Sequence, residues 1–96
     1  MKKAYVLVFN TNFASRRKFV EVLDECKTVL IWRYDLSNGI YIISENSAHE
    51  IAKEIERRVG TGPGRFLLLE YTSNSQGRLT DESWHLLNNK YIKPVT

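Results

Sequence analysis

Four segments of this chain are apolar at both odd and even positions. In residues 4–9, Ala4, Val6 and Val8 alternate with Tyr5, Leu7 and Phe9. The same double pattern recurs in residues 28–34, 40–44 and 65–71. Side chains that follow one another along a strand point to opposite faces of the sheet. The pattern therefore predicts four strands whose sheet is apolar on both faces.

The residues between these strands have the apolar spacing of amphipathic helices. The first helix is expected over residues 15–26, with Ser15 as its N-cap. The second begins with a capping box, in which Ser47 and Glu50 satisfy each other's backbone amides, and ends at Gly60. The apolar stripes are Phe19, Val22, Leu23 and Cys26 in the first helix and Ile51, Ala52, Ile55 and Val59 in the second.

The resulting order is strand, helix, strand, strand, helix, strand, in which Asn38-Gly39 predicts a hairpin between the two middle strands. This order predicts an α+β fold, a two-layer sandwich of ferredoxin-like topology with both helices on one face of a four-stranded antiparallel sheet. Residues 1–96 are expected to form one domain. Residues 71–96 are a C-terminal extension with a short helix from Thr80 and a tail that could add an edge strand or cross to a partner.

Two helices on one face leave the other apolar face without cover. About five large side chains left in water, at about 100 Å² each, would forgo roughly 12 kcal/mol. That loss is comparable with the whole stability of a small domain. We therefore expect a homodimer that buries the uncovered face. The expected interface residues are Tyr5, Leu7, Phe9, Trp32, Tyr34, Tyr41, Leu69 and Tyr71.

Composition narrows the class of protein. With 43% hydrophobic and 26% charged residues, the chain resembles an ordinary globular protein. No apolar run approaches the roughly 20 residues of a membrane-spanning helix, and residues 4–9 are too short for a signal-peptide core. The single cysteine, Cys26, cannot form an internal disulfide and is expected to be buried. These features predict a cytoplasmic protein without membrane contact.

The basic residues cluster, which favours an anionic partner beyond what the net charge of +3 would suggest. Arg16, Arg17 and Lys18 occupy the first turn of a helix, where the helix dipole disfavours cations. With Arg57, Arg58 and Arg65 they form the predicted nucleic-acid-binding set. The alternative is a solvated basic face, in which Glu21 offsets Arg17.

Candidate catalytic residues are few. His49 and His85 are the two histidines, and neither lies at metal-ligand spacing from another ligand. The glycine-rich run 60–64 follows a helix, which is the reverse of the order that a phosphate-binding loop needs. We therefore assign no catalytic residue, no metal and no cofactor, and an enzymatic role is not favoured.

The aromatic side chains offer another function. RNA-recognition modules share this topology and stack bases on exposed sheet aromatics. The candidates here are Tyr5, Phe9, Trp32, Tyr34, Tyr41 and Tyr71. The chain lacks the basic-glycine-aromatic signature of those modules, and Leu7, Leu30 and Ile43 lie among the aromatics. That mixture favours a dry dimer interface over a stacking surface.

Several segments together resemble a known family. They are Trp32-Arg33-Tyr34, Asn38-Gly39-Ile40-Tyr41, Ser47-Ala48-His49-Glu50-Ile51, the run 65–70 and Glu82-Ser83-Trp84. With the first strand, they resemble small bacterial SinR-like proteins, which are similar in plan to the CRISPR-associated Cas-two family and its toxin-type endoribonuclease relatives. The resemblance implies a homodimer with the two sheets face to face and the tail crossing to the partner.

Nuclease members of that family carry a metal-binding aspartate at the end of the first strand. This chain has Asn10 in the corresponding place. An amide oxygen carries no charge, and magnesium sites usually include a carboxylate. The resemblance therefore implies a relative without metal-dependent cleavage.

Three functions follow as hypotheses. The first is a non-catalytic homodimer that binds RNA or DNA through its basic residues. The second is a protein-interaction or antitoxin-like regulatory subunit, whose partner would be encoded nearby. The third is a metal-independent endoribonuclease that uses His49 or His85.

Overall fold

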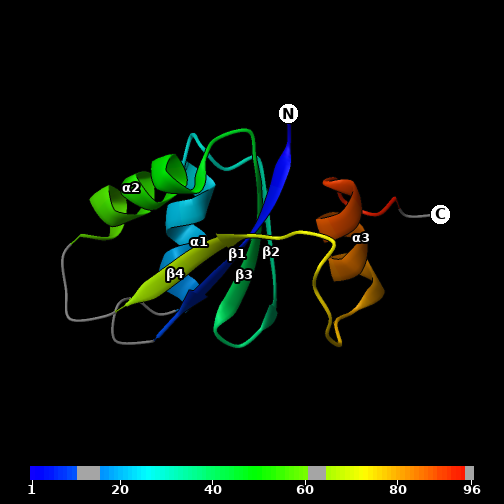
Figure 1. The fold of residues 1–96 in the computed structure, drawn as a ribbon. Helices are drawn as coiled ribbons and strands as arrows, with labels where there is room; N and C mark the ends of the chain where they lie inside the picture. The colour runs from blue at the N-terminus through cyan, green and yellow to red at the C-terminus, as the bar shows by residue number, and fades with distance from the viewer. Residues whose placement is uncertain (11–15, 61–64, 95–96) are drawn as a thin grey trace.

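The computed structural model describes residues 1–10, 16–60 and 65–94. Seven elements follow one another in Figure 1: β1 (Lys3–Phe9), α1 (Arg16–Glu25), β2 (Ile31–Leu36), β3 (Gly39–Ser44), α2 (Ala48–Val59), β4 (Phe66–Glu70) and α3 (Asp81–Asn89). All strand pairs are antiparallel, and the strands lie in the order β2-β3-β1-β4. The predicted α+β class and the four-stranded antiparallel sheet are confirmed.

The caps explain where the helices begin and end. The Ser47 hydroxyl accepts a hydrogen bond from the Glu50 amide, and the Glu50 carboxylate accepts one from the Ser47 amide, so the predicted capping box is confirmed. Gly60 ends α2 with a φ of 93°, a conformation that favours glycine. Thr80 caps α3 by accepting from the Ser83 amide. The predicted cap Ser15 lies outside the described residues.

The β2–β3 hairpin forms as predicted, but its boundaries differ from those expected. Gly39 is the first residue of β3, and the register shifts between Tyr34 and Leu36. At its other end β2 starts at Ile31, whereas the strand pattern begins at Thr28. The reason is that the Thr28 amide donates to the Glu54 carboxylate in α2 instead of pairing with a strand.

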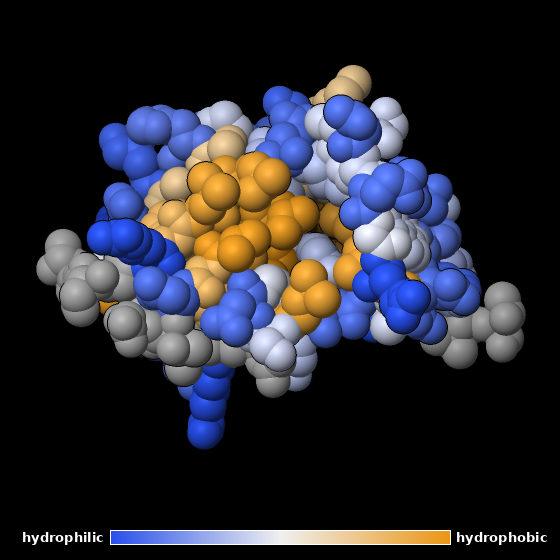
Figure 2. Space-filling view, turned by 60° about the horizontal axis from the view of Figure 1, so that its bottom comes forward, coloured by the Kyte–Doolittle hydropathy of each residue, from blue (hydrophilic) through white to orange (hydrophobic). Residues whose placement is uncertain are grey.

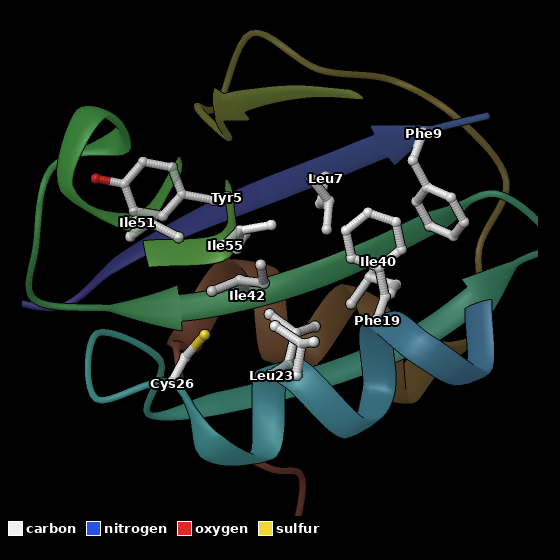
Figure 3. Packing of buried hydrophobic residues seen from close by; sticks show 11 residues of the cluster. Tyr5, Leu7, Phe9, Phe19, Leu23, Cys26, Ile40, Ile42, Ile51 and Ile55 are labelled. Carbon is white, nitrogen blue, oxygen red and sulfur yellow. The ribbon is translucent and has the colours of Figure 1, made fainter. Parts of the chain in front are cut away.

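The main core lies between the sheet and helices α1 and α2. Figure 3 shows Leu7 and Ile40 of the sheet pointing toward Phe19 and Leu23 of α1. The Phe9 and Phe19 rings lie 4.4 Å apart between centroids. The fully buried side chains here include Leu7, Phe19, Leu23, Ile40, Ile42, Ile51 and Ile55. One apolar face of the sheet is thus covered by two helices.

The other face is covered in part by α3, which corrects the expectation that its cover must come from outside the chain. Leu86 and Leu87 of α3 are buried against Ala4, Tyr41 and Ile43 of the sheet. In Figure 1, α3 lies on the side of the sheet opposite α1 and α2. The sequence pattern indicated a helix here without indicating its packing partner.

The predicted tail strand is not present in residues 91–94, which pair with no strand of the sheet. Tyr91 instead packs edge-on against His85, with ring centroids 5.0 Å apart. Ile92 is 68% exposed. Residues 91–94 therefore add no strand to the sheet.

A buried carboxylate joins α2 to the loop before β2. Glu54 is 5% exposed and accepts hydrogen bonds from the Lys27 and Thr28 amides and from the Thr28 hydroxyl. Arg58 donates to the same carboxylate at 3.1 Å. Although burial alone would raise the pKa of Glu54, the hydrogen bonds from Thr28, Lys27 and Arg58 outweigh it and lower that pKa to about 2.

Because the pKa of Glu54 is lower in the folded chain than in the unfolded chain, its stabilising effect is present above about pH 5 and is lost as the pH falls toward about 2. We predict that Glu54→Gln lowers the free energy of unfolding at pH 7 by on the order of 2 kcal/mol and flattens its dependence on pH over this acidic range. Urea unfolding at several pH values measures both effects. Glu45→Gln, an exposed control, should leave the dependence unchanged, and an equal effect of both variants would contradict the assignment.

Candidate functional site

An exposed apolar strip crosses the end of the sheet that α3 does not cover. It consists of Val8, Leu67 and Leu69, which are 45%, 63% and 44% exposed. Val8 pairs with Leu67, and Leu69 pairs with the half-buried Val6, so these residues are neighbours on β1 and β4. Figure 2 shows a patch of apolar surface surrounded by polar residues. A patch of this kind on a small protein commonly marks an interaction site.

Three predicted interface residues lie on the wrong face for this site. Tyr5, Leu7 and Phe9 point into the core beneath α1 and α2, and each is at most 4% exposed. They alternate along β1 with Ala4, Val6 and Val8, which reach the second face. The expectation that Tyr5, Leu7 and Phe9 form an outward surface is therefore corrected.

The remaining predicted interface residues are divided between the two faces. Trp32 packs against the main core, its indole nitrogen donates to Asp24 of α1, and Tyr34 stacks beside it. Tyr41 and Tyr71 belong to the cluster with α3, where Tyr41 is fully buried. Of the eight, Leu69 alone belongs to the exposed apolar strip. The aromatics do not share one exposed face, which also argues against the base-stacking hypothesis.

The exposed apolar strip also contains two residues that the sequence analysis did not select. Val8 and Leu67 lie on the same face of the sheet as Leu69. The alternation of side chains along each strand predicts this placement from the sequence. The predicted interface included Tyr5 and Phe9 instead, because it was chosen mainly from aromatic residues. A stricter assignment of each residue to one face would have identified Val8 and Leu67.

Two of the predicted phosphate contacts form ion pairs with the buried Glu54 carboxylate. Arg58 is 27% exposed on its side chain and contacts both Glu54 of α2 and Glu25 of α1. Arg57 lies 3.7 Å from the Glu54 carboxylate. Both residues lie in the last turn of α2, where cations stabilise the helix dipole. The ion pairs with Glu54 and the helix dipole therefore explain the position of Arg57 and Arg58 without a bound nucleic acid.

Other basic residues lie at the opposite end of α1. Arg17 is in its first turn with a side chain 92% exposed and lies 3.8 Å from Glu21, and Lys18 beside it is exposed. Arg16 begins the helix, and its side chain is outside the described part of the structure. Because Arg58 contacts Glu25 at the other end of α1, the six predicted cations do not form one continuous cluster.

Arg65 lies beside the exposed apolar strip. Its backbone exchanges hydrogen bonds with Asn10, whose side chain accepts from the Arg65 amide and whose own amide donates to the Arg65 carbonyl. Asn10, Arg65, Val8 and Leu67 border a shallow hollow of about 340 Å³. In Figure 1 the beginnings of α1 and β4 lie at the same end of the sheet. Arg17, Lys18 and Arg65 are therefore at this shared end.

The structure gives the histidines and Asn10 no common catalytic arrangement. His49 is exposed in the first turn of α2, whereas His85 lies in α3 with a buried Nε2 that has no hydrogen-bond partner among the described residues. No group of three or more metal-binding side chains occurs in residues 1–10, 16–60 and 65–94. The Asn10 side chain accepts a hydrogen bond from the Arg65 amide and so holds the chain at the start of β4.

Comparison with known proteins found no matching family model, no matching curated protein and no matching solved structure. The resemblance to SinR-like proteins therefore stays a prediction. Among the described residues, no helix has the length and apolar character needed to cross a membrane.

Cys26 is buried beside the Glu54 carboxylate. Burial, and to a lesser degree the negative charge of Glu54, raises the pKa of its thiol to about 11. Because the thiolate is the reactive form, we predict that the folded protein reacts with a disulfide reagent at pH 7.5 at least about a hundredfold more slowly than the unfolded chain. Absorbance of the released thiol measures the rate. Comparable rates with and without denaturant would contradict this burial.

Proposed function

We propose that this protein is a small, non-catalytic binding module that works as a homodimer through the exposed apolar strip. The observation that carries the proposal is the exposure of Val8, Leu67 and Leu69 on adjacent strands. The strip contains no charged side chain, so it offers nothing to select a partner of opposite charge. A second copy presents the same aliphatic surface, and a twofold axis brings two such surfaces together.

The fold supports the same proposal. Read from the other edge, the strand order is β4-β1-β3-β2, and α1 and α2 join strands in the succession expected of a ferredoxin-like domain. We infer that the domain is a ferredoxin-like sandwich to which α3 has been added on the second face. Since α3 packs against Ala4 of β1 as well as against β2 and β3, a partner is expected over the part of β1 and β4 that holds Val8, Leu67 and Leu69.

We predict that Leu67→Lys weakens self-association by about ten- to hundredfold, since each copy then places a charge in the interface and loses a buried leucine. Sedimentation equilibrium over a range of concentrations measures the dissociation constant. Leu30→Lys is the matched control, because Leu30 is 48% exposed but lies just before β2, the edge strand farthest from β4.

The two variants separate the possible outcomes. A wild-type protein that stays monomeric at all concentrations would contradict the homodimer, and a heterodimer formed through the same residues would favour the regulatory-subunit hypothesis. Equal association of Leu67→Lys and Leu30→Lys would place the interface elsewhere. Circular dichroism confirms that each variant is folded.

A second function, binding of RNA or DNA phosphates, is favoured by the position of Arg17, Lys18 and Arg65 at one end of the sheet. All three are exposed, in contrast to Arg58. A homodimer would carry two such ends. Binding to phosphates is independent of base sequence and depends strongly on salt concentration.

We predict that Arg17→Gln and Arg65→Gln each weaken nucleic-acid binding evenly across sequences and lower the slope of its salt dependence by about one. Fluorescence anisotropy with duplex DNA, single-stranded DNA and RNA at several salt concentrations measures both. Arg57→Gln should have a smaller effect, because Arg57 faces the Glu54 carboxylate. Absence of salt-dependent binding to all three nucleic acids would contradict this function.

A further inference from the structure

A pocket opens between the second face of the sheet and the segment that follows β4. Its volume is about 370 Å³, which is within the range of sites for small molecules. Val6 and Tyr41 form part of its wall on the sheet, and Trp84 of α3 forms part of the opposite wall. The connection between β4 and α3 contributes Tyr71, Arg78 and Leu79 to the pocket lining. None of Val8, Leu67 and Leu69 lines the pocket, but Val6 of its wall pairs with Leu69, so the pocket borders the exposed apolar strip.

The hydroxyl of Tyr41 is unusual among the groups of this pocket. It is buried, and no described residue accepts or donates a hydrogen bond to it. Buried polar groups in folded proteins nearly always have a partner, because an unpaired one costs about 1–3 kcal/mol. Burial, with a smaller effect of the Asp35 charge, raises the pKa of Tyr41 to about 12, so the hydroxyl keeps its proton and can donate it. Because the hydroxyl has almost no exposed surface, an acceptor atom of a ligand in the pocket would reach it once neighbouring side chains move aside.

Arg78 supplies the charge that the apolar walls lack. Its side chain is exposed, and within the part of the chain that the structure describes it makes neither an ion pair nor a hydrogen bond. A guanidinium binds a carboxylate through two parallel hydrogen bonds. Tyr71 and Trp84 offer aromatic rings against which a flat molecule can pack.

We propose that this pocket binds a small planar aromatic carboxylate, whose ring packs against Tyr71 and Trp84, whose carboxylate pairs with Arg78, and which accepts a hydrogen bond from Tyr41. The size of the pocket limits the ligand to one small molecule. This inference does not depend on the proposed homodimer or on nucleic-acid binding.

The probe for this proposal is 6-hydroxy-2-naphthoate, titrated into the full chain and followed by the indole N–H signals in nitrogen-15 NMR spectra. The Trp84 signal should shift in a saturable way, whereas the signal of Trp32, which contacts Asp24 on the other face, should not. The neutral analogue 2-naphthol should bind about ten- to hundredfold more weakly, because it lacks the carboxylate.

Two variants test the polar contacts separately. Arg78→Gln should weaken the binding of 6-hydroxy-2-naphthoate by about ten- to hundredfold and leave the binding of 2-naphthol almost unaffected. Arg17→Gln, which replaces an arginine on α1 and serves as the control, should change the binding of neither probe. Tyr41→Phe should weaken the binding of 6-hydroxy-2-naphthoate about three- to tenfold. Its melting temperature should be unchanged or higher, because the substitution removes an unpaired buried hydroxyl.

Three results would overturn the proposal. The first is no saturable shift of Trp84 at millimolar probe. The second is equal binding by Arg78→Gln and Arg17→Gln. The third is a large fall in the melting temperature of Tyr41→Phe, which would mean that the hydroxyl already has a partner within the folded chain.

Discussion

A sheet with large apolar side chains on both faces requires cover on both, and the described part of this 96-residue chain provides three helices. Helices α1 and α2 cover the centre of one face, so that Leu7, Ile40 and Ile42 lose all contact with water. Helix α3 is short and reaches only part of the other face. The exposed strip of Val8, Leu67 and Leu69 is what remains, and the proposed role of the protein follows from it.

Electrostatic interactions inside the fold engage some of the basic residues that the sequence predicted as phosphate contacts. The Glu54 carboxylate gathers two backbone amides, the Thr28 hydroxyl and Arg58 in one place. This cluster fixes the loop before β2 and, with Glu25, engages Arg58. Arg17, near the start of α1, lies 3.8 Å from the exposed Glu21. Tertiary contacts thus distinguish the half-buried Arg58 from the exposed Arg17.

The sequence predicted the elements that depend on local interactions. The capping box at Ser47 and Glu50, the helix end at Gly60 and the hairpin before Gly39 each involve residues close together in the chain, and each is confirmed. The burial of Cys26 followed from its place on a helical apolar stripe. These features require no knowledge of which element packs on which.

The features that the sequence missed depend on contacts between distant segments. The apolar stripe of α3 gave no indication that Leu86 and Leu87 would cover Ala4 and Ile43. The pairing of Arg58 with Glu25 joins two helices, and Tyr41 is buried in the cluster that the sheet forms with α3. The error at Tyr5, Leu7 and Phe9 had a different origin, since it came from combining residues of both faces into one surface.

The central claim is that the strip left open by α3 is covered by a second copy in solution. Its most direct test is the attenuation of methyl NMR signals by a soluble paramagnetic gadolinium chelate, at a protein concentration where the wild type is associated. The account predicts that the methyl groups of Leu67 and Leu69 are protected, whereas those of Leu30, which is similarly exposed in the single chain, are strongly attenuated. Equal attenuation of Leu67, Leu69 and Leu30 would show that the strip faces water and would contradict the account.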